Sequence, residues 1–168
     1  MSKITGLKKV LLPKHFRDNR GLFVKLFATN LFGDFEIAEV YFSKTKKGFI
    51  RGMHYQSGKF ANNRIIYCSN GTVHDILIDL RENSNTFLNI YSVKLNANQN
   101  FAMFIPKGVA HGFQALTTNA TVIYISDKKY NKKYDKGVFP LSGEFSWPIK
   151  IKGISKRDKS LPKLNTSN

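Results

Sequence analysis

Residues 72–80 read TVHDILIDL, and this stretch has the composition and spacing of a β-strand. It is short and rich in branched apolar residues, and the turn-forming residues 69–71 (SNG) come directly before it. Because successive side chains of a strand point to opposite faces, His74, Ile76 and Ile78 share one face. We therefore predict a strand here.

Similar short segments, rich in aromatic and branched residues, recur on both sides of this stretch. They predict further strands at 22–27, 37–43, 64–68, 87–95, 101–106 and 120–126. No window of helical length has sustained apolar spacing, although residues 28–35 have room for one or two helical turns. Many short strands without an alternation of strands and helices indicate an all-β sandwich or barrel.

The length and the composition favour one intracellular domain. A chain of 168 residues is a single domain by its length, and we expect the domain at 1–158 and a polar tail at 159–168. Cys68 is the only cysteine, so no disulfide can form within the chain and a reducing compartment is favoured. The sequence shows neither a signal peptide nor an apolar run of membrane-spanning length. We expect a soluble, cytoplasmic protein with no membrane partner.

The chain is strongly basic, with 27 Lys and Arg against 11 Asp and Glu and a net charge of +16. The lysines are scattered through loops, which favours a solvated surface without a special partner. An anionic small substrate is the second interpretation, because a basic cleft attracts it. Nucleic acid is the least favoured partner of the three.

The four histidines differ in their surroundings. His54 lies in RGMHYQ beside Arg51, and His111 follows a Pro/Gly loop in IPKGVAHGF, where we expect it just before a strand. His15 and His74 lack polar neighbours, so we interpret both as structural. His54 and His111 are the candidates for chemistry.

A metal site is not expected, because the metal-binding pattern of a His-x-His pair followed closely by Glu is absent. Here Tyr55 and Gln56 follow His54, and the next glutamate is Glu82. Two isolated histidines do not supply the ligand set that a metal ion requires. We therefore expect no metal.

Proton transfer needs a base near neutral pKa, a group that orients it, an acid, and a charge that stabilises an enolate. His54 is the natural base, and a carboxylate on its far nitrogen would fix its tautomer. Asp158 is one candidate for that carboxylate, although spacing does not select it from the seven aspartates. Arg51 and Arg64 supply positive charge for a diphosphate or an oxyanion.

With these residues considered, the chain resembles the dTDP-4-dehydrorhamnose 3,5-epimerase family. The matching segments occur in the family's order over about nine tenths of the chain: FRDNRGLF (16–23), GFIRGMHYQ (48–56), NGTVHDILIDLRENSNTF (70–87), FIPKGVAHGF (104–113), ATVIY (120–124), SWP (146–148) and ISKRD (154–158). The resemblance implies a cupin-type jelly roll, or double-stranded β-helix, with short helical segments. It also implies a homodimer that exchanges N-terminal strands, and no cofactor.

The resemblance assigns the catalytic roles residue by residue. His54 falls on the family's base and Asp158 on the acidic partner of that base. Tyr124 falls on the proton donor that acts from the opposite face of the sugar.

The substrate-binding positions follow in the same way. Arg51 falls on an arginine that holds the diphosphate, and Arg64 on a position where the family usually has an enolate-stabilising lysine. His111 falls on a second active-site histidine, and Tyr130 on an aromatic residue near the nucleotide base. Arg20 falls in a segment that reaches toward a neighbouring subunit's nucleotide site.

The chain departs from the family pattern in the residues that recognise the substrate. Where the family commonly reads Gln-x-Asn-x-Ser, this chain has Glu39, Tyr41 and Ser43, and these positions help to recognise the sugar. Lys25 stands where the family has a glutamate, near the nucleotide base. The machinery for proton transfer is retained, whereas the recognition residues differ.

The sequence therefore predicts a metal-independent epimerase of a nucleoside-diphosphate 4-keto-6-deoxyhexose, of the type that converts dTDP-4-dehydro-6-deoxyglucose to dTDP-4-dehydrorhamnose. One alternative is a single-centre enzyme that inverts only C3 or only C5 of another nucleotide sugar. An alternative of another class is a non-catalytic cupin that binds a sugar nucleotide or nucleic acid.

Overall fold

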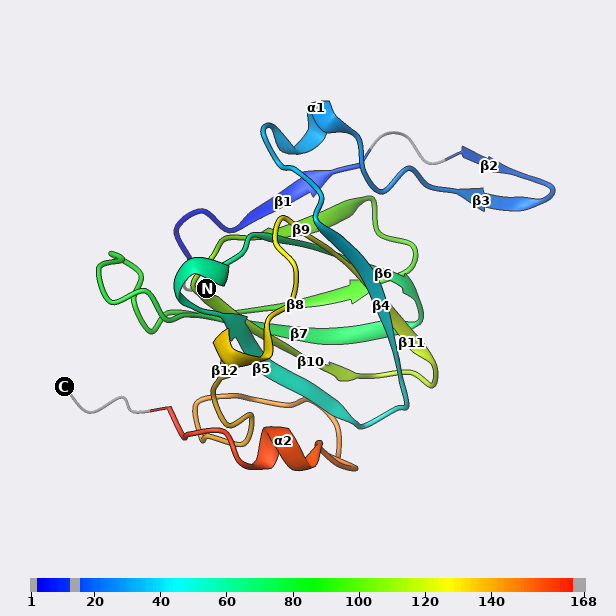
Figure 1. Cartoon of the computed structure of the whole chain (residues 1–168). Helices are drawn as coiled ribbons and strands as arrows, with labels where there is room; N and C mark the ends of the chain where they lie inside the picture. The colour runs from blue at the N-terminus through cyan, green and yellow to red at the C-terminus, as the bar shows by residue number, and fades with distance from the viewer. Residues whose placement is uncertain (1–2, 13–15, 165–168) are drawn as a thin grey trace.

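The chain forms two five-stranded antiparallel sheets that pack face to face, in a computed structural model that describes residues 3–12 and 16–164 (Figure 1). One sheet contains, in spatial order, β1 (Lys8–Leu11), β9 (Phe101–Ile105), β6 (Arg64–Asn70), β11 (Ala120–Ser126) and β4 (Glu39–Thr45). The other contains β12 (Asp135–Gly137), β5 (Ile50–Gln56), β10 (Val109–Ala115), β7 (Thr72–Asp79) and β8 (Ile90–Asn96). The prediction of an all-β protein is confirmed.

The remaining elements are short. A projecting hairpin consists of β2 (Phe16–Asp18) and β3 (Gly21–Phe23), and the helices are α1 (Thr29–Phe32) and α2 (Lys156–Lys159) (Figure 1). Two 3₁₀ turns are η1 (Gly58–Phe60) and η2 (Lys132–Tyr134). From β4 to β12 the chain passes repeatedly from one sheet to the other, as in a jelly roll.

The main core fills the space between the two sheets. Val73 and Leu77 of β7 face inward and pack with Met103 of β9 and Phe113 of β10, and all four are at most 1% exposed. Burial of an apolar side chain of this size contributes about 1.5–3 kcal/mol. The alternation read from residues 72–80 thus places one face of β7 in this core.

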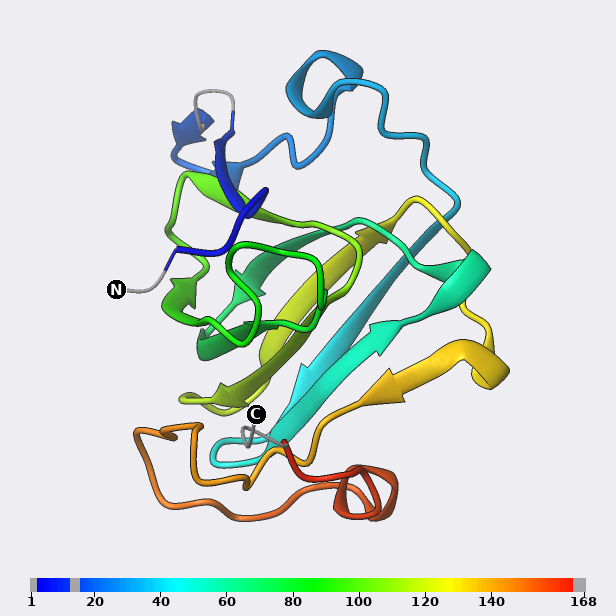
Figure 2. The ribbon, with the colours of Figure 1, turned by 90° about the vertical axis from the view of Figure 1, so that its left-hand side faces the viewer.

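The two chain ends cover the outer faces of the sandwich, as Figure 2 shows with the N-terminal part above it and the C-terminal part below. Phe27, Phe32 and Phe35 pack on the outer face of the first sheet. Val138, Phe145 and Trp147 pack on the outer face of the second. His74 lies on that second outer face, edge-on to the Trp147 ring, which agrees with a structural role.

Two predictions about strands are wrong. The predicted strand at 22–27 ends at Phe23, because Val24, Leu26 and Phe27 pack against the first sheet as an irregular segment. His111, expected before a strand, lies inside β10, whose seven residues are all buried. The prediction of a helical turn within 28–35 is confirmed by α1.

Part of the predicted tail at 159–168 contacts the domain. The backbone N–H of Phe139 donates to the carbonyl of Pro162 over 2.7 Å, and Leu164 packs on the outer cluster of the second sheet. His15 lies outside the described residues, so its structural role stays a prediction. No helix in the described ranges is long and apolar enough to cross a membrane.

A buried carboxylate organises the loop between β7 and β8. Asp79 is fully buried and accepts hydrogen bonds from the Arg81 guanidinium, the Ser84 hydroxyl and the Thr86 hydroxyl at 2.6–2.7 Å. Arg81 also donates to the carbonyl of Thr5, which ties the N-terminal segment to the loop. Burial alone would raise the pKa of Asp79, but these hydrogen bonds outweigh it and lower the pKa to about 2.

We expect Asp79→Asn to destabilise the fold by about 2 kcal/mol at neutral pH. Because the pKa of Asp79 is lower in the folded state than in the unfolded state, the carboxylate stabilises the fold fully above about pH 4. That contribution is lost as the pH falls through the folded pKa of about 2. Urea unfolding at both ends of this range measures the difference. The exposed Asp34→Asn is the control, and an equal loss in both variants would contradict the role of Asp79.

Candidate active site

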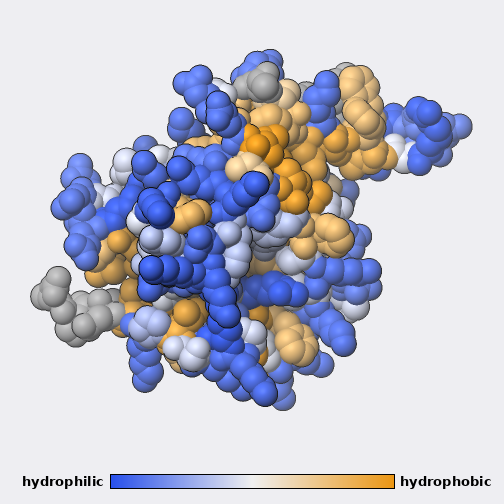
Figure 3. Space-filling view, in the orientation of Figure 1, coloured by the Kyte–Doolittle hydropathy of each residue, from blue (hydrophilic) through white to orange (hydrophobic). Residues whose placement is uncertain are grey.

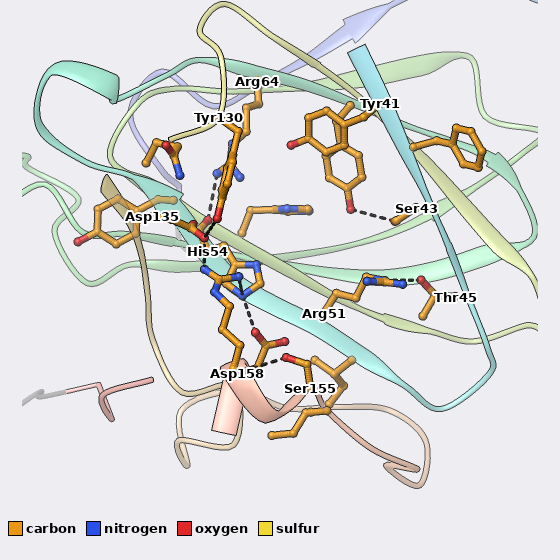
Figure 4. Close-up of a pocket in the computed structure, with 18 of the residues that line it drawn as sticks. Tyr41, Ser43, Thr45, Arg51, His54, Arg64, Tyr130, Asp135, Ser155 and Asp158 are labelled. Atoms are coloured by element: carbon orange, nitrogen blue, oxygen red, sulfur yellow. Dashed lines mark hydrogen bonds and ion pairs between the residues drawn. The ribbon is translucent and has the colours of Figure 1, made fainter. Parts of the chain in front are cut away.

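One large cavity of about 950 Å³ opens between the two sheets, next to β4, an edge strand of the first sheet, and β5 of the second (Figure 4). Its walls come from both sheets, from Tyr130 and Asp135 at and before β12, and from the start of α2. Its size is that of a small-molecule site. Every site residue predicted from the sequence lines it, with the single exception of Arg20: Glu39, Tyr41, Arg51, His54, Arg64, His111, Tyr124, Tyr130 and Asp158.

The floor of the cavity depends on a close approach of β5 and β10. Gly52 has φ +115°, and a Cβ there would lie 2.5 Å from the Cα of Gly112. Only glycine fits this contact, because any side chain would overlap the neighbouring backbone. The approach brings His54 and His111 directly opposite each other in the ladder.

His54 and Asp158 form a pair at the edge of the cavity (Figure 4). The Nε2 atom of His54 lies 2.6 Å from Oδ1 of Asp158, which is 3% exposed. Ser155 caps α2 by accepting the backbone N–H of Asp158, and this cap fixes where the carboxylate lies. Burial alone would raise the pKa of Asp158, but the hydrogen bond with His54 and the backbone of Gly52 outweigh it and lower the pKa. Asp158 is thus an ionised partner of the imidazole.

Arg157 makes a second contact to the same ring nitrogen. Its Nη1 lies 2.9 Å from Nε2 of His54, and its Nη2 lies 2.5 Å from Oδ2 of Asp135. The hydroxyl of Tyr130 donates to the same Asp135 oxygen over 2.9 Å. One imidazole nitrogen cannot donate to Asp158 and accept from Arg157 at once. We assign a proton to Nε2, because the shorter contact is to a carboxylate, and this leaves the Nδ1 lone pair as the basic site.

Arg64 places a positive charge at the base of the cavity. It is 7% exposed, and its Nη2 donates to the carbonyls of His54 and Val109 at 3.2 and 3.0 Å. Its buried Nε has no hydrogen-bond partner within residues 3–12 and 16–164. Burial lowers the pKa of Arg64, yet a guanidinium remains charged at neutral pH. The arginine therefore places a fixed positive charge beside any ligand in the cavity.

Tyr124 faces the cavity from the sheet opposite to His54. Its hydroxyl shares a hydrogen bond of 3.4 Å with Ser43, and its ring stacks on Tyr41 (Figure 4). Burial raises the pKa of Tyr124, so the phenol keeps its proton at neutral pH. It can act as an acid.

A second histidine–carboxylate pair lies deeper. Nε2 of His111 is 2.8 Å from Oδ2 of Asp75, and the two residues are 4% and 0% exposed. Burial raises the pKa of Asp75, whereas the contact with His111 acts in the opposite direction. Sequence reasoning missed Asp75, although its place on the inner face of β7, between Val73 and Leu77, signals a buried carboxylate.

The remaining predicted residues lie at the rim, apart from Arg20. Arg51 donates from Nε to the Thr45 hydroxyl over 2.9 Å, and Glu39 accepts the backbone N–H of Tyr130 over 3.0 Å. Arg20 is at the tip of the β2–β3 hairpin, where it pairs with Asp18 outside the cavity of its own chain. No group of three or more His, Cys, Asp or Glu side chains suited to a metal ion occurs in the part of the chain that the structure describes.

Comparison with known proteins shows which family the chain belongs to. The family model described as dTDP-4-dehydrorhamnose 3,5-epimerase matches residues 2–166. The chain belongs to this family. A curated relative of the same name from Shigella flexneri is 33% identical over an alignment of 163 residues, and the match covers 92% of this chain and 90% of that relative.

Solved structures of family members share the fold. An epimerase from Legionella pneumophila, in complex with dTDP-4-keto-L-rhamnose, has a TM-score of 0.85 at 27% identity and covers 96% of this chain and 95% of its own. A double mutant of a 3′-monoepimerase from Streptomyces bikiniensis, in complex with dTDP, has a TM-score of 0.88 at 27% identity, covering 96% of this chain and 84% of its own. The predicted cupin-type jelly roll is confirmed.

The assigned tautomer can be measured by nitrogen-15 NMR of the histidine rings. In the wild-type protein we expect Nε2 of His54 to carry the proton at neutral pH, because Asp158 accepts it. In Asp158→Asn the amide N–H₂ can donate to the ring, so the population shifts toward the Nδ1–H tautomer. His74, on the outer face, is the internal control and should not change. An unchanged His54 tautomer in the variant would show that Asp158 does not set it.

Proposed function

We propose that the protein epimerises a nucleoside-diphosphate 4-keto-6-deoxyhexose, at C3 and C5, by proton transfer through an enolate. The observation that carries this proposal is the placement of His54, paired with Asp158, and Tyr124 on opposite sheets, with Arg64 lining the same cavity. This arrangement supplies a base, an acid on the other side, and a cation for the negative charge that develops.

The chemistry follows from the ketone. A carbonyl at C4 acidifies the hydrogens on the two adjacent carbons, so a base of modest strength can remove them. Nδ1 of His54 takes the proton, and Asp158 stabilises the imidazolium that forms. The charged guanidinium of Arg64 stabilises the enolate oxygen, and Tyr124 returns a proton from the opposite face. No metal or cofactor takes part in this scheme.

Diphosphate binding anchors the reacting ring. Arg51 at the rim supplies positive charge. Arg157 is paired with Asp135, and an entering diphosphate can compete with that carboxylate for the Arg157 guanidinium. Binding energy from the diphosphate holds the sugar ring in line with His54 and Tyr124. Glu39 and Tyr41 line the same cavity and contact the sugar, His111 lies beside it, and the nucleotide base packs on Tyr130.

The names of the relatives support the substrate class. The Legionella pneumophila structure contains dTDP-4-keto-L-rhamnose, and the Streptomyces bikiniensis structure contains dTDP. In the latter a histidine and a tyrosine are substituted, and they are as far apart along that chain as His54 and Tyr124 are here. That protein is a 3′-monoepimerase, which keeps inversion of a single carbon as the alternative within this class.

A binding-only protein of this fold is the alternative of another class. The set of base, orienting carboxylate and buried proton donor argues against it, because binding alone requires none of the three. We also propose that the enzyme acts in the cytoplasm. Cys68 is buried and forms no disulfide, which is compatible with a reducing compartment.

The function is tested by proton NMR with dTDP-4-keto-6-deoxyglucose in heavy water, where loss of the C3 and C5 signals reports exchange and product analysis reports inversion. We expect both carbons to exchange and to invert. His54→Asn should lower the rate of inversion at both carbons by about 10²–10⁴-fold, and Tyr124→Phe should lower it by a similar factor at one carbon at least.

His74→Asn is the matched control, because this histidine lies on the outer face and should leave the rate unchanged. A His54→Asn variant as active as the wild type would overturn the proposed base. Inactivity of the wild type toward the dTDP sugar and its UDP, GDP and CDP analogues would overturn the proposed activity.

We further propose a homodimer built on the N-terminal hairpin and β4. Apolar side chains that a monomer would leave in water lie on the hairpin, on β4 and at the end of β1: Phe16, Phe23, Val40, Phe42 and Leu11 are 57–69% exposed. Figure 3 shows apolar residues massed beneath α1 and toward the hairpin. Exposed apolar patches of this kind are typical of protein interfaces. The position of Arg20 on the hairpin, away from its own cavity, fits a role in a neighbouring subunit.

We expect the wild-type protein to sediment as a dimer, and the double variant Phe16→Ser/Phe23→Ser to sediment as a monomer, because it removes the apolar contact area. Leu141→Ser, which alters an exposed apolar residue elsewhere, should remain dimeric. Analytical ultracentrifugation measures all three. A wild-type monomer at every concentration tested would rule out this assembly.

A further inference from the structure

Two tyrosine rings lie stacked in the wall of the cavity. Tyr41 and Tyr124 are direct partners in the ladder of β4 and β11, with ring centroids 4.8 Å apart and an interplanar angle of 11°. Both line the cavity, and Figure 4 shows Tyr41 on the same side of it as Ser43 and Arg64. The proposed proton donor therefore has a second phenol at its side.

The two hydroxyl groups are differently engaged. The hydroxyl of Tyr124 shares its hydrogen bond with Ser43, whereas no hydrogen bond engages the Tyr41 hydroxyl among the described residues. Tyr41 is 43% exposed and lines the cavity. A third phenol, that of Tyr130, is bonded to Asp135. Of these three phenols, Tyr41 has a hydroxyl free to meet a ligand.

The electrostatic surroundings suit a proton donor. Burial raises the pKa of Tyr41, so the hydroxyl is protonated before reaction, and the nearby charge of Arg64 offsets part of this rise. The same guanidinium acts on Tyr124. A cation beside a phenol lowers the cost of the phenolate that remains when the proton leaves.

Inversion of two carbons leaves a role for a second proton donor. Each carbon beside the ketone must receive its new proton from the face opposite to the base, and the two carbons occupy different places in the cavity. We propose that Tyr41 is a second catalytic acid, so that Tyr124 delivers the proton to one carbon and Tyr41 to the other. This inference rests on the proposed epimerase function and adds a residue to it.

The step balances within the site. When His54 takes the carbon-bound proton, the electron pair of that bond passes into the enolate. The enolate electron pair then forms the new C–H bond with the proton of the Tyr41 hydroxyl, which becomes a phenolate. Water returns a proton to the phenolate, and His54 releases its own to water. The net result is one inverted carbon and one exchanged hydrogen.

The test is Tyr41→Phe, because this change keeps the stacked ring and removes only the hydroxyl. We expect inversion at one of the two carbons to fall by about 10²-fold while the other keeps its rate. Exchange without inversion persists at the affected carbon, because His54 can return a proton to the same face. Tyr124→Phe should give the opposite pattern. Tyr130→Phe, which alters a hydroxyl bonded to Asp135, should slow neither carbon selectively.

The outcomes separate this inference from the proposed function. Equal slowing of both carbons in Tyr41→Phe would assign Tyr41 to packing against Tyr124 and would overturn the second acid. Unchanged rates would overturn it as well, and so would a wild-type enzyme that inverts one carbon only. A wild type that exchanges neither carbon would overturn the proposed function itself, and this inference with it.

Discussion

The close contact of β5 and β10 is the constraint on which the site depends. A Cβ on Gly52 would meet the backbone of Gly112, and a Cβ on Gly112 would lie 2.5 Å from the sulfur of Met53. Neither position tolerates a side chain, so the two strands can approach this closely only because both residues are glycine. This contact sets His54 opposite His111 and leaves both facing the cavity. The chemistry of the site is thus built on two residues that carry no functional group.

Charge placement in the cavity follows from the same two-sheet architecture. Arg64, Asp75, His111 and Asp158 are each at most 7% exposed, so little water screens them and their mutual interactions are strong. Each is paired or hydrogen-bonded, which offsets the cost of burying it. Arg157 is different, because it is partly exposed and shares its contacts between Asp135 and His54. It is the charge in this group that an incoming anion can most easily attract.

The sequence predicted the strands with regular alternation well and missed the two glycine-containing strands that carry His54 and His111. The predicted segment 120–126 matches β11 in both bounds, because its branched and aromatic residues alternate without interruption. β5 and β10 were missed because Gly52, His54 and Gly112 break that alternation, and these residues are the ones that shape the cavity. The segment 22–27 reads as a strand but packs as irregular chain, since its apolar residues cover the outer face of a sheet.

In the candidate site, too, some residues could be found from the sequence, whereas the contacts between distant segments could not. Composition and spacing picked out His54 as a base, and the family resemblance added Asp158 and Tyr124, which lie in the same cavity. The link from Arg157 to Asp135 joins α2 to β12, and no local pattern in the sequence encodes such a contact. The stacking of Tyr41 on Tyr124 required the register of β4 against β11, which is set by the pairing of distant segments.

The excess of positive charge affects how fast anions reach the cavity. Lys44, Lys46, Arg51 and Arg157 stand around the opening of the cavity, on a chain whose net charge is +16. A field of this sign accelerates the approach of a dianion at low ionic strength, and physiological salt screens it over about 8 Å. The same field draws in every other nucleotide in solution. Selection among anions therefore falls to the residues deeper inside the cavity, so that the charges around the opening serve capture and the interior serves discrimination.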